Sequence, residues 1–158
     1  SLADRYKDEP WIGGYDLLNE THWDLGENEL RDFYVDVTQE IRQFDQNHVI
    51  FIEGNGYAND FSGLTPPWDD NMAYSFHKYW SYNDSLEWVT WMRNQYSVPL
   101  WMGEAGENSN QWFTEAIKEF EENYIGWAFW PLKKIESISA MYAISSNPNY
   151  ESLVNYFR

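Results

Sequence analysis

Apolar residues gather along the chain in five runs that lack a clean alternation of apolar and polar positions. Branched and aromatic residues fill these runs, and continuous apolar strands are typical of parallel sheets that are covered on both faces. We therefore expect five buried parallel strands. They lie near 11–19, 48–54, 71–77, 98–104 and 124–130.

Apolar residues at helical spacing mark most of the segments between these strands. In 28–45, for example, apolar residues recur from Leu30 to Phe44 as a single stripe. Asp84 is the expected N-cap of a second helix, and Ser109 or Asn110 that of a third. The expected helices are 28–45, 85–96, 110–123 and 149–158, and the expected loops are 55–70, with only a short helix, and 131–148.

Alternating strands and helices leave two main architectures, an open doubly wound sheet or a (β/α)8 barrel. An open nucleotide-binding sheet would need a glycine-rich first turn, and none is present. Glu20 and Glu104 are three strand-to-strand steps apart, at about 28 residues a step, close to the roughly 31 residues per unit of a barrel. The chain is therefore expected to supply the last five βα units of a TIM barrel, strands 4–8.

Composition narrows the possible partners. The net charge of -16 argues against nucleic acid and against anionic membranes, because both attract basic surfaces. The chain has no cysteine, hence no disulfide and no thiolate metal site, and no apolar run approaches the roughly 20 residues of a membrane span. Ten Trp and 12 Tyr exceed what a core requires and favour flat ligands such as sugar rings, or an interface.

Two glutamates carry the candidate chemistry. Glu20 closes the run that begins at Ile12, and Glu104 closes the run that begins at Val98. A single glutamate is most often a solvated loop residue, but these two recur at a whole number of barrel units. The carboxyl ends of barrel strands form the active-site face. A pair of carboxylates on that face is suited to acid/base catalysis and nucleophilic attack at a glycosidic bond.

Further polar and aromatic residues end the same strands. His77 and Tyr79 follow the third strand, where a tyrosine hydroxyl would hold a nucleophilic glutamate in its ionised form. Trp130 ends the last strand and has room to present a flat face to a sugar. His77 and Trp130 also have a plain structural interpretation, as core side chains. His48 opens a strand at the opposite face and is interpreted as structural.

The loop around the first glutamate adds weaker candidates. Asn19 precedes Glu20 and is placed to hydrogen-bond a sugar hydroxyl, whereas His22 and Trp23 follow it and are placed to line the leaving-group side. Acidic residues are scattered over the loops without the spacing of a calcium-binding loop, so no metal site is expected.

At these positions the chain resembles glycoside hydrolase family 5, the cellulase family of (β/α)8 barrels. The resemblance rests on GYDLLNE at 14–20, HKY at 77–79, WMGE at 101–104 and GWAFW at 126–130. Each motif is weak alone, but together, in this order and at these strand ends, they are specific. The resemblance extends over essentially all of 1–158, which we take as the C-terminal portion of one catalytic domain.

The resemblance implies a role for each candidate. Glu20 would be the general acid/base and Glu104 the nucleophile of a retaining hydrolase without a cofactor. The remaining implied contacts are with substrate: Asn19 with the sugar 2-hydroxyl, His77 and Tyr79 with substrate and nucleophile, and Trp130 as a stacking platform.

The chain also departs from the family. Thr21 stands where a proline is frequent, and nothing corresponds to the arginine and histidine that the family's early strands supply. Residues 1–10 look like the end of a helix stopped by Pro10. A partial barrel would also expose two sheet edges. We therefore expect a complementary N-terminal half as partner, through a separate chain or a preceding segment.

The expected function is cleavage of β-linked glucan, as in a cellulase or endoglucanase. A β-mannanase, a β-1,3-glucanase and an exo-acting glucosidase share these residues and stay open. A non-catalytic carbohydrate-binding barrel is disfavoured, since binding alone does not require both glutamates. A small independent α/β domain with incidental glutamates is the last alternative. A polymeric substrate favours a secreted or periplasmic location, although the sequence carries no export signal.

Overall fold

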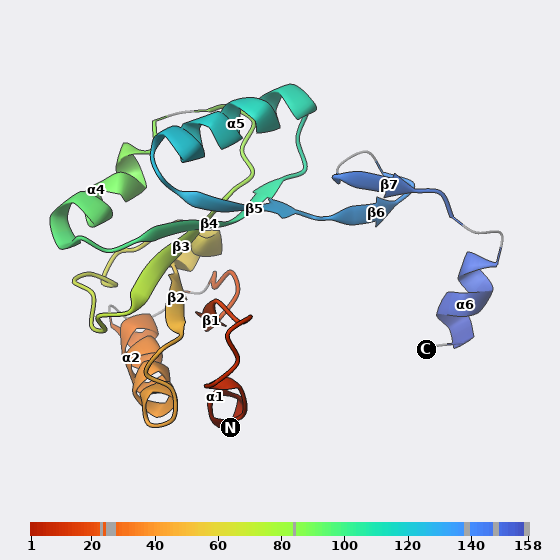
Figure 1. Ribbon diagram of the computed structural model, residues 1–158. Helices are drawn as coiled ribbons and strands as arrows, with labels where there is room; N and C mark the ends of the chain where they lie inside the picture. Colours follow the sequence, from red (N-terminus) through yellow and green to blue (C-terminus); the bar gives the residue numbers. More distant parts are fainter. Residues whose placement is uncertain (23, 25–27, 84, 138–139, 147–148, 157–158) are drawn as a thin grey trace.

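The computed structural model describes residues 1–22, 24, 28–83, 85–137, 140–146 and 149–156 (Figure 1). All five expected strands are present, and they form one parallel sheet in the order β1-β2-β3-β4-β5. This order, with each strand beside the next, is that of consecutive units of a barrel. The strands are β1 Gly14–Asp16, β2 Val49–Glu53, β3 Met72–Lys78, β4 Leu100–Gly106 and β5 Gly126–Trp130.

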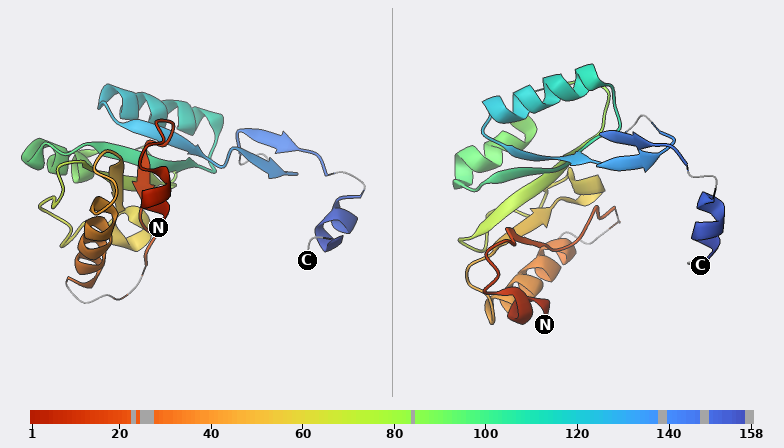
Figure 2. Two further views of the ribbon diagram at one scale, coloured as in Figure 1. Left: turned by 60° about the horizontal axis from the view of Figure 1, so that its bottom comes forward. Right: turned by 45° about the vertical axis from the view of Figure 1, so that its right-hand side comes forward.

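The long helices lie on one side of this sheet, as Figures 1 and 2 show. Each connects two neighbouring strands, so the strands all run in the same direction. None of the helices in the described segments is long and apolar enough to cross a membrane. The helices are α1 Leu2–Tyr6, α2 Glu29–Arg42, α3 Asn55–Ala58, α4 Glu87–Tyr96, α5 Asn110–Glu122 and α6 Tyr150–Tyr156.

The segment 131–148 differs from the expected loop. It contains two short strands, β6 Lys133–Ile135 and β7 Tyr142–Ile144, which pair with each other beyond the end of the main sheet (Figure 1). The prediction of a loop was wrong because β6 is short and mostly polar, so it lacks the apolar run that marks a buried strand. The two strands and α6 project away from the sheet (Figure 2).

The expected helix caps have different outcomes. The Ser109 hydroxyl accepts a hydrogen bond from the Trp112 N–H at 3.1 Å, as predicted for the start of α5. The prediction for α4 falls on Asp84, which lies outside the described residues. The N-cap position of α4 is Leu86, without a side-chain cap, and the Ser85 hydroxyl accepts from the Glu87 N–H instead.

The core lies between the sheet and the helices. Alternate residues of β2, β3 and β4 point toward the helices, and the residues between them point to the other face. On the helix side, Phe76 meets the ring of Phe120 edge-on at 6.2 Å. The large apolar side chains of this core that are fully buried are Tyr34, Ile50, Ile52, Leu64, Tyr74, Phe76, Met92, Met102 and Phe120.

Arg42, the last residue of α2, hydrogen-bonds to the segments that precede β2 and β3 at the amino end of the sheet. Its Nε and Nη2 donate to the two carboxylate oxygens of Asp69, each at 2.8 Å, and Nη1 donates to the His48 carbonyl at 2.9 Å. His48 is buried there, with Nδ1 2.6 Å from Asp45 Oδ2. The placement of His48 agrees with its interpretation as structural, because the active-site face of a barrel is at the opposite end.

We expect Arg42→Met to lower the free energy of unfolding of the full-length protein by about 2–4 kcal/mol, because it leaves Asp69 without its forked donor in a partly buried site. Urea unfolding measures this loss. Lys118→Met is the control, since Lys118 forms an exposed pair with Glu122 and its loss should cost less than about 0.5 kcal/mol. Equal effects of the two changes would contradict the role given to Arg42.

Candidate active site

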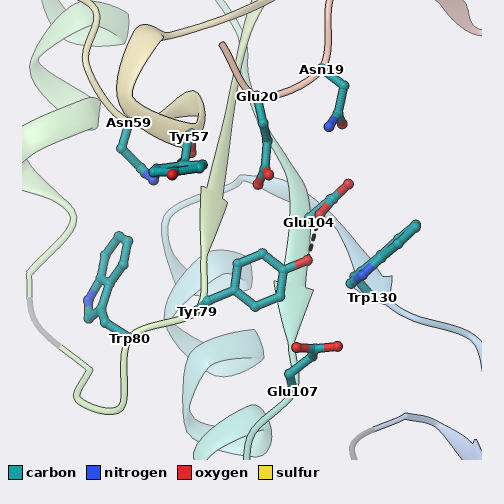
Figure 3. Close-up of a pocket in the computed structure, with 9 residues that line it drawn as sticks. All are labelled: Asn19, Glu20, Tyr57, Asn59, Tyr79, Trp80, Glu104, Glu107 and Trp130. Atoms are coloured by element: carbon teal, nitrogen blue, oxygen red, sulfur yellow. Dashed lines mark hydrogen bonds between the residues drawn. The ribbon is translucent and has the colours of Figure 1, made fainter. Parts of the chain in front are cut away.

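Glu20 and Glu104 lie side by side at the carboxyl ends of the strands, as Figure 3 shows. Glu20 is on the loop after β1, and Glu104 is on β4, paired in register with His77 of β3. One carboxylate oxygen of each glutamate and one ring nitrogen of His77 all lie within 4.8 Å of one another. The side chains of both glutamates are partly exposed, 28% for Glu20 and 18% for Glu104.

Gly103 allows Glu104 to take this position. A Cβ on Gly103 would lie 2.6 Å from Ser75 Oγ and 3.2 Å from His77 Nε2. A side chain at this position would force Ser75, and to a smaller extent His77, to shift, so glycine fits best where β4 passes the imidazole. The glycine before the glutamate in the WMGE motif therefore has a steric explanation.

His77 lies beneath the two glutamates and is 2% exposed. Its Nδ1 is 2.7 Å from Glu20 Oε1 and 3.7 Å from Glu104 Oε2, and its Nε2 is 3.2 Å from Glu53 Oε1. Burial alone would lower the pKa of His77, but hydrogen bonds to Glu53 and Glu20 and the surrounding carboxylate charges outweigh burial and raise it to about 9. The ring is therefore an imidazolium at neutral pH and donates from both nitrogens.

Tyr79 holds the second glutamate. Its hydroxyl donates a hydrogen bond to Glu104 Oε2 at 2.5 Å. Burial, followed by this hydrogen bond and the charge of Glu104, raises the pKa of Tyr79 well above its usual range, so the hydroxyl stays protonated. This permanent donor fixes the orientation of the Glu104 carboxyl group.

Glu53, at the end of β2, supports the first glutamate from below, and sequence reasoning missed it. Its Oε2 accepts the backbone N–H of Glu20 at 2.6 Å. Glu20 has a φ of 47°, in the left-handed region that is uncommon for a residue with a side chain. The signal was available, because Glu53 also closes a buried run, VIFIE at 49–53.

Asp16, on β1, packs its carboxyl group against Glu53, although much of the residue faces solvent. Burial of the carboxyl group, the charge of Glu53 and a hydrogen bond to it raise the pKa of Asp16 to about 7. A carboxyl group that holds its proton near neutral pH can donate a hydrogen bond to the neighbouring carboxylate. The acid pair therefore carries less negative charge below the site than two free carboxylates would.

A pocket of about 820 Å³ opens above the two glutamates. In Figure 3, Asn19 and Trp130 lie on one side of Glu20 and Glu104, and Tyr57, Asn59 and Trp80 lie on the other. Trp130 is half exposed, as expected for a stacking surface. The residues that line the pocket are Asn19, Glu20, Tyr57, Asn59, Tyr79, Trp80, Glu104, Glu107 and Trp130.

Two of the predicted substrate contacts lie elsewhere. His77 does not line the pocket, and its contacts are with carboxylates. His22 is exposed and stacks on the ring of Tyr57 at 4.2 Å, so it supports a lining residue from outside. Trp23 lies outside the described residues. The other predicted substrate contacts, Asn19, Tyr79 and Trp130, all line the pocket.

The side of the pocket formed by Tyr57, Asn59 and Trp80 was not predicted from the sequence. Gly56 and Tyr57 in α3 both have a φ of 60°, and this turn brings Tyr57 and Asn59 over the pocket. Trp80 directly follows the HKY motif and lies over the buried Lys78, with Nζ 4.0 Å from the ring centroid. Only its position next to Tyr79 hinted at this role, whereas the turn at Tyr57 left no sequence signal.

The same site contains a group that could hold a metal ion within the described part of the chain, namely Glu20, His77 and Glu104. A metal needs a neutral imidazole with a free lone pair. The ring of His77 is protonated at neutral pH and faces a carboxylate on each side. The group is therefore better suited to hydrogen bonding between side chains than to metal binding.

The charge on His77 should make stability depend on pH. The pKa of His77 is about 9 in the folded protein against about 6.5 when unfolded, so its stabilisation is complete below about pH 6.5 and is lost as pH rises through about 9. Urea unfolding of the full-length protein at pH 6 and pH 9.5 should show this loss, on the order of 3 kcal/mol. In His77→Gln the decrease should be smaller by that amount, and an equal decrease in both proteins would contradict it.

The sequence of this chain matches a known protein family and one curated relative. The model of the family described as cellulase (glycosyl hydrolase family 5) matches residues 1–135. A β-xylosidase from Phanerodontia chrysosporium is 40% identical over 80 residues, which are 49% of this chain and 17% of that protein.

Solved structures of cellulases share the fold. Cel5A of Thermotoga maritima, in a mutant form with cellobiose, has a TM-score of 0.69 at 21% identity, covering 82% of this chain and 54% of that chain. The same enzyme with mannotriose has a TM-score of 0.68 at 19% identity, with coverage of 82% and 55%. The cellulase Cel5C_n has a TM-score of 0.75 at 17% identity, with coverage of 98% and 50%.

The chain thus spans about half the length of these solved structures and a smaller share of the β-xylosidase. Its five parallel strands, which neighbour one another in sequence order, are part of a (β/α)8 barrel, as the sequence predicted. From the match over residues 1–135, the chain belongs to glycosyl hydrolase family 5, the cellulase family.

Proposed function

We propose that the whole protein is a retaining glycoside hydrolase that cleaves β-glucan, in the manner of a cellulase or endoglucanase. The observation that carries the proposal is the closeness of the two carboxylates, whose nearest oxygens lie within 4.8 Å. Retaining enzymes hold their carboxyl groups about 5–5.5 Å apart, whereas inverting enzymes need about 6.5–9.5 Å to admit a water between them. The separation therefore favours double displacement.

Glu104 is the proposed nucleophile. Its Oε2 accepts a hydrogen bond from Tyr79 and lies 3.7 Å from Nδ1 of the His77 imidazolium, so both groups stabilise negative charge on this oxygen. Oε1 is then the oxygen that attacks the anomeric carbon and forms the glycosyl-enzyme. The Tyr79 hydrogen bond fixes the orientation of the carboxylate before the substrate binds.

Glu20 is the proposed acid/base. It donates a proton to the departing glycosidic oxygen in the first step and takes a proton from water in the second. Glu20 becomes negatively charged as the first step proceeds, and the His77 N–H already lies 2.7 Å from its Oε1. A donor fixed at the place where charge develops lowers the barrier without reorganisation of the site.

The two walls of the pocket match the two parts of the substrate. The side with Asn19 and Trp130 suits the sugar that is attacked, through a hydroxyl contact and a flat ring surface. The side with Tyr57, Asn59 and Trp80 would then take the leaving sugar. A pocket of about 820 Å³ has room for more than one sugar ring, which supports an oligo- or polysaccharide substrate.

The identity of the sugar has two further candidates. A β-mannan is favoured by the mannotriose complex of Cel5A, whose fold this chain shares. A β-xyloside is favoured by the β-xylosidase that is 40% identical over 80 residues. Hydrolysis of aryl β-cellobioside, β-mannobioside and β-xyloside by the full-length protein separates the three. A polymeric substrate also supports the proposal that the protein is exported.

We also propose that an N-terminal half completes the barrel. β1 is an edge strand of the sheet, where a further strand can pair. A groove of about 470 Å³ lies beside it, lined by apolar residues that include Leu17, Val37, Ile41 and Phe44. The first strands of a barrel and their helices would cover this groove and close the pocket from the open side.

We expect Glu104→Ala to lower kcat for an aryl β-cellobioside by about 10⁴-fold or more, with substrate binding largely retained, because no covalent intermediate can form. Added azide should replace the missing nucleophile and give an α-glycosyl azide, whereas Glu20→Ala with azide should give the β-glycosyl azide. Product analysis by NMR distinguishes the two. Glu122→Ala, at an exposed site on α5, is the control and should remain fully active. Full activity of Glu104→Ala would end the assignment.

We expect Tyr57→Ala to lower kcat/KM for cellotetraose by about tenfold through the loss of ring contact with the leaving sugar. β-Cellobiosyl fluoride has a leaving group too small to reach Tyr57, so its hydrolysis should be nearly unaffected. Trp130→Ala is the matched comparison and should impair both substrates. If Tyr57→Ala impairs the fluoride as strongly as the tetraose, this wall does not bind the leaving group.

A further inference from the structure

Glu53 is a buried carboxylate whose side chain contacts the catalytic centre from the side away from the substrate. It is 2% exposed and does not line the pocket. A buried carboxylate is costly unless it is paired and hydrogen-bonded, so its partners indicate what it does.

Glu53, Glu20 and His77 contact one another in a closed cycle. Oε2 accepts the Glu20 backbone N–H at 2.6 Å, and Oε1 is 3.2 Å from His77 Nε2. The other nitrogen of the same imidazole, Nδ1, is 2.7 Å from the carboxylate of Glu20. One carboxylate thus fixes the acid/base twice, through its main chain and, by way of His77, through its side chain.

The packing of the sheet does not account for this carboxylate. Tyr34, on α2, donates to the backbone carbonyl of Glu53 at 3.0 Å and would do so whatever the side chain. The other side chain in contact with the carboxylate is that of Asp16, which also lies at the carboxyl end of the sheet. The partners of the Glu53 carboxylate therefore belong to the active-site end.

We infer that Glu53 is a positioning residue, which holds Glu20 in its strained backbone conformation and keeps the His77 N–H directed at the Glu20 carboxylate. This inference rests on the proposed function of the site. A φ of 47° at Glu20 persists only where its surroundings enforce it, and the Glu53 Oε2 contact does so. The negative charge of Glu53 favours the imidazolium form of His77, which must donate from both nitrogens.

Glu53→Gln tests this with little change of shape. A carboxylate accepts from two donors with its two oxygens, whereas the amide has one oxygen and an NH2 group. In the variant, the NH2 group therefore faces either the Glu20 N–H or the His77 N–H, and one of the two hydrogen bonds that Glu53 accepts is lost. The charge that favours the imidazolium is lost as well.

The experiment compares two aryl β-cellobiosides in the full-length enzyme, one with phenol and one with 2,4-dinitrophenol as leaving group. The kcat/KM reports formation of the glycosyl-enzyme, for which phenol needs a proton from Glu20 and dinitrophenol hardly does. Glu53→Gln should lower kcat/KM about 100-fold for the phenyl substrate and less than about threefold for the dinitrophenyl substrate. An equal loss on both, or no loss on either, would overturn the inference.

The matched control is Asp45→Asn. Asp45 is also a buried acid paired with a histidine, with Oδ2 2.6 Å from His48 Nδ1, but at the amino end of the sheet. The change should lower the melting temperature without altering the ratio of the two kcat/KM values. If it alters the ratio as Glu53→Gln does, the ratio reports general loosening, and Glu53 has no special role.

Two further measurements keep the inference testable. If Glu53→Gln does not fold, Glu53→Asp retains the charge but withdraws it by one methylene, and the same selective loss is expected. If the wild type cleaves neither substrate, the proposed function fails by itself. The ¹⁵N shift of the His77 ring then decides the inference, because the pKa of His77 should fall in whichever Glu53 variant folds. An unchanged pKa would overturn it.

Discussion

The site depends on one positively charged ring held among three carboxylates. The His77 imidazolium lies between Glu20, Glu53 and Glu104, which come from the loop after β1, the end of β2 and the carboxyl half of β4. Without that charge, negative charges on these acidic side chains would repel one another in a partly dry environment, where such repulsion is strong. The proton on His77 therefore allows Glu20 and Glu104, the proposed acid/base and nucleophile, to lie as close together as double displacement would require.

The parallel sheet makes this convergence possible, because its strands all end at one face. The polar side chains at the two ends of the sheet have different partners. At the amino end, Arg42, Asp45 and His48 form contacts that join α2 to the sheet, and none of them lines the pocket. At the carboxyl end, the buried polar groups His77 and Glu53 lie beneath the glutamates that line the pocket. Changes at the amino end are therefore expected to affect stability without altering the proposed active site.

Much of the fold could be predicted because buried parallel strands leave long apolar runs, as 71–77 and 98–104 do. The strands β6 and β7 could not, since they are short and partly polar and pair with each other in a separate two-stranded sheet. The pocket wall at Tyr57 was also missed. It depends on left-handed backbone at Gly56 and Tyr57, which the local sequence does not specify for a tyrosine.

The site residues show what a strand-end carboxylate reveals and what it does not. Glu20, Glu53 and Glu104 all follow buried apolar runs, so this pattern marks their position but not their roles. Burial separates them: Glu20 and Glu104 are 28% and 18% exposed and line the pocket, whereas Glu53 is 2% exposed beneath it. Exposure depends on which side chains cover each carboxylate, and those come from other strands. A search for catalytic carboxylates in similar barrels should therefore treat a third strand-end acid as a support for the pair.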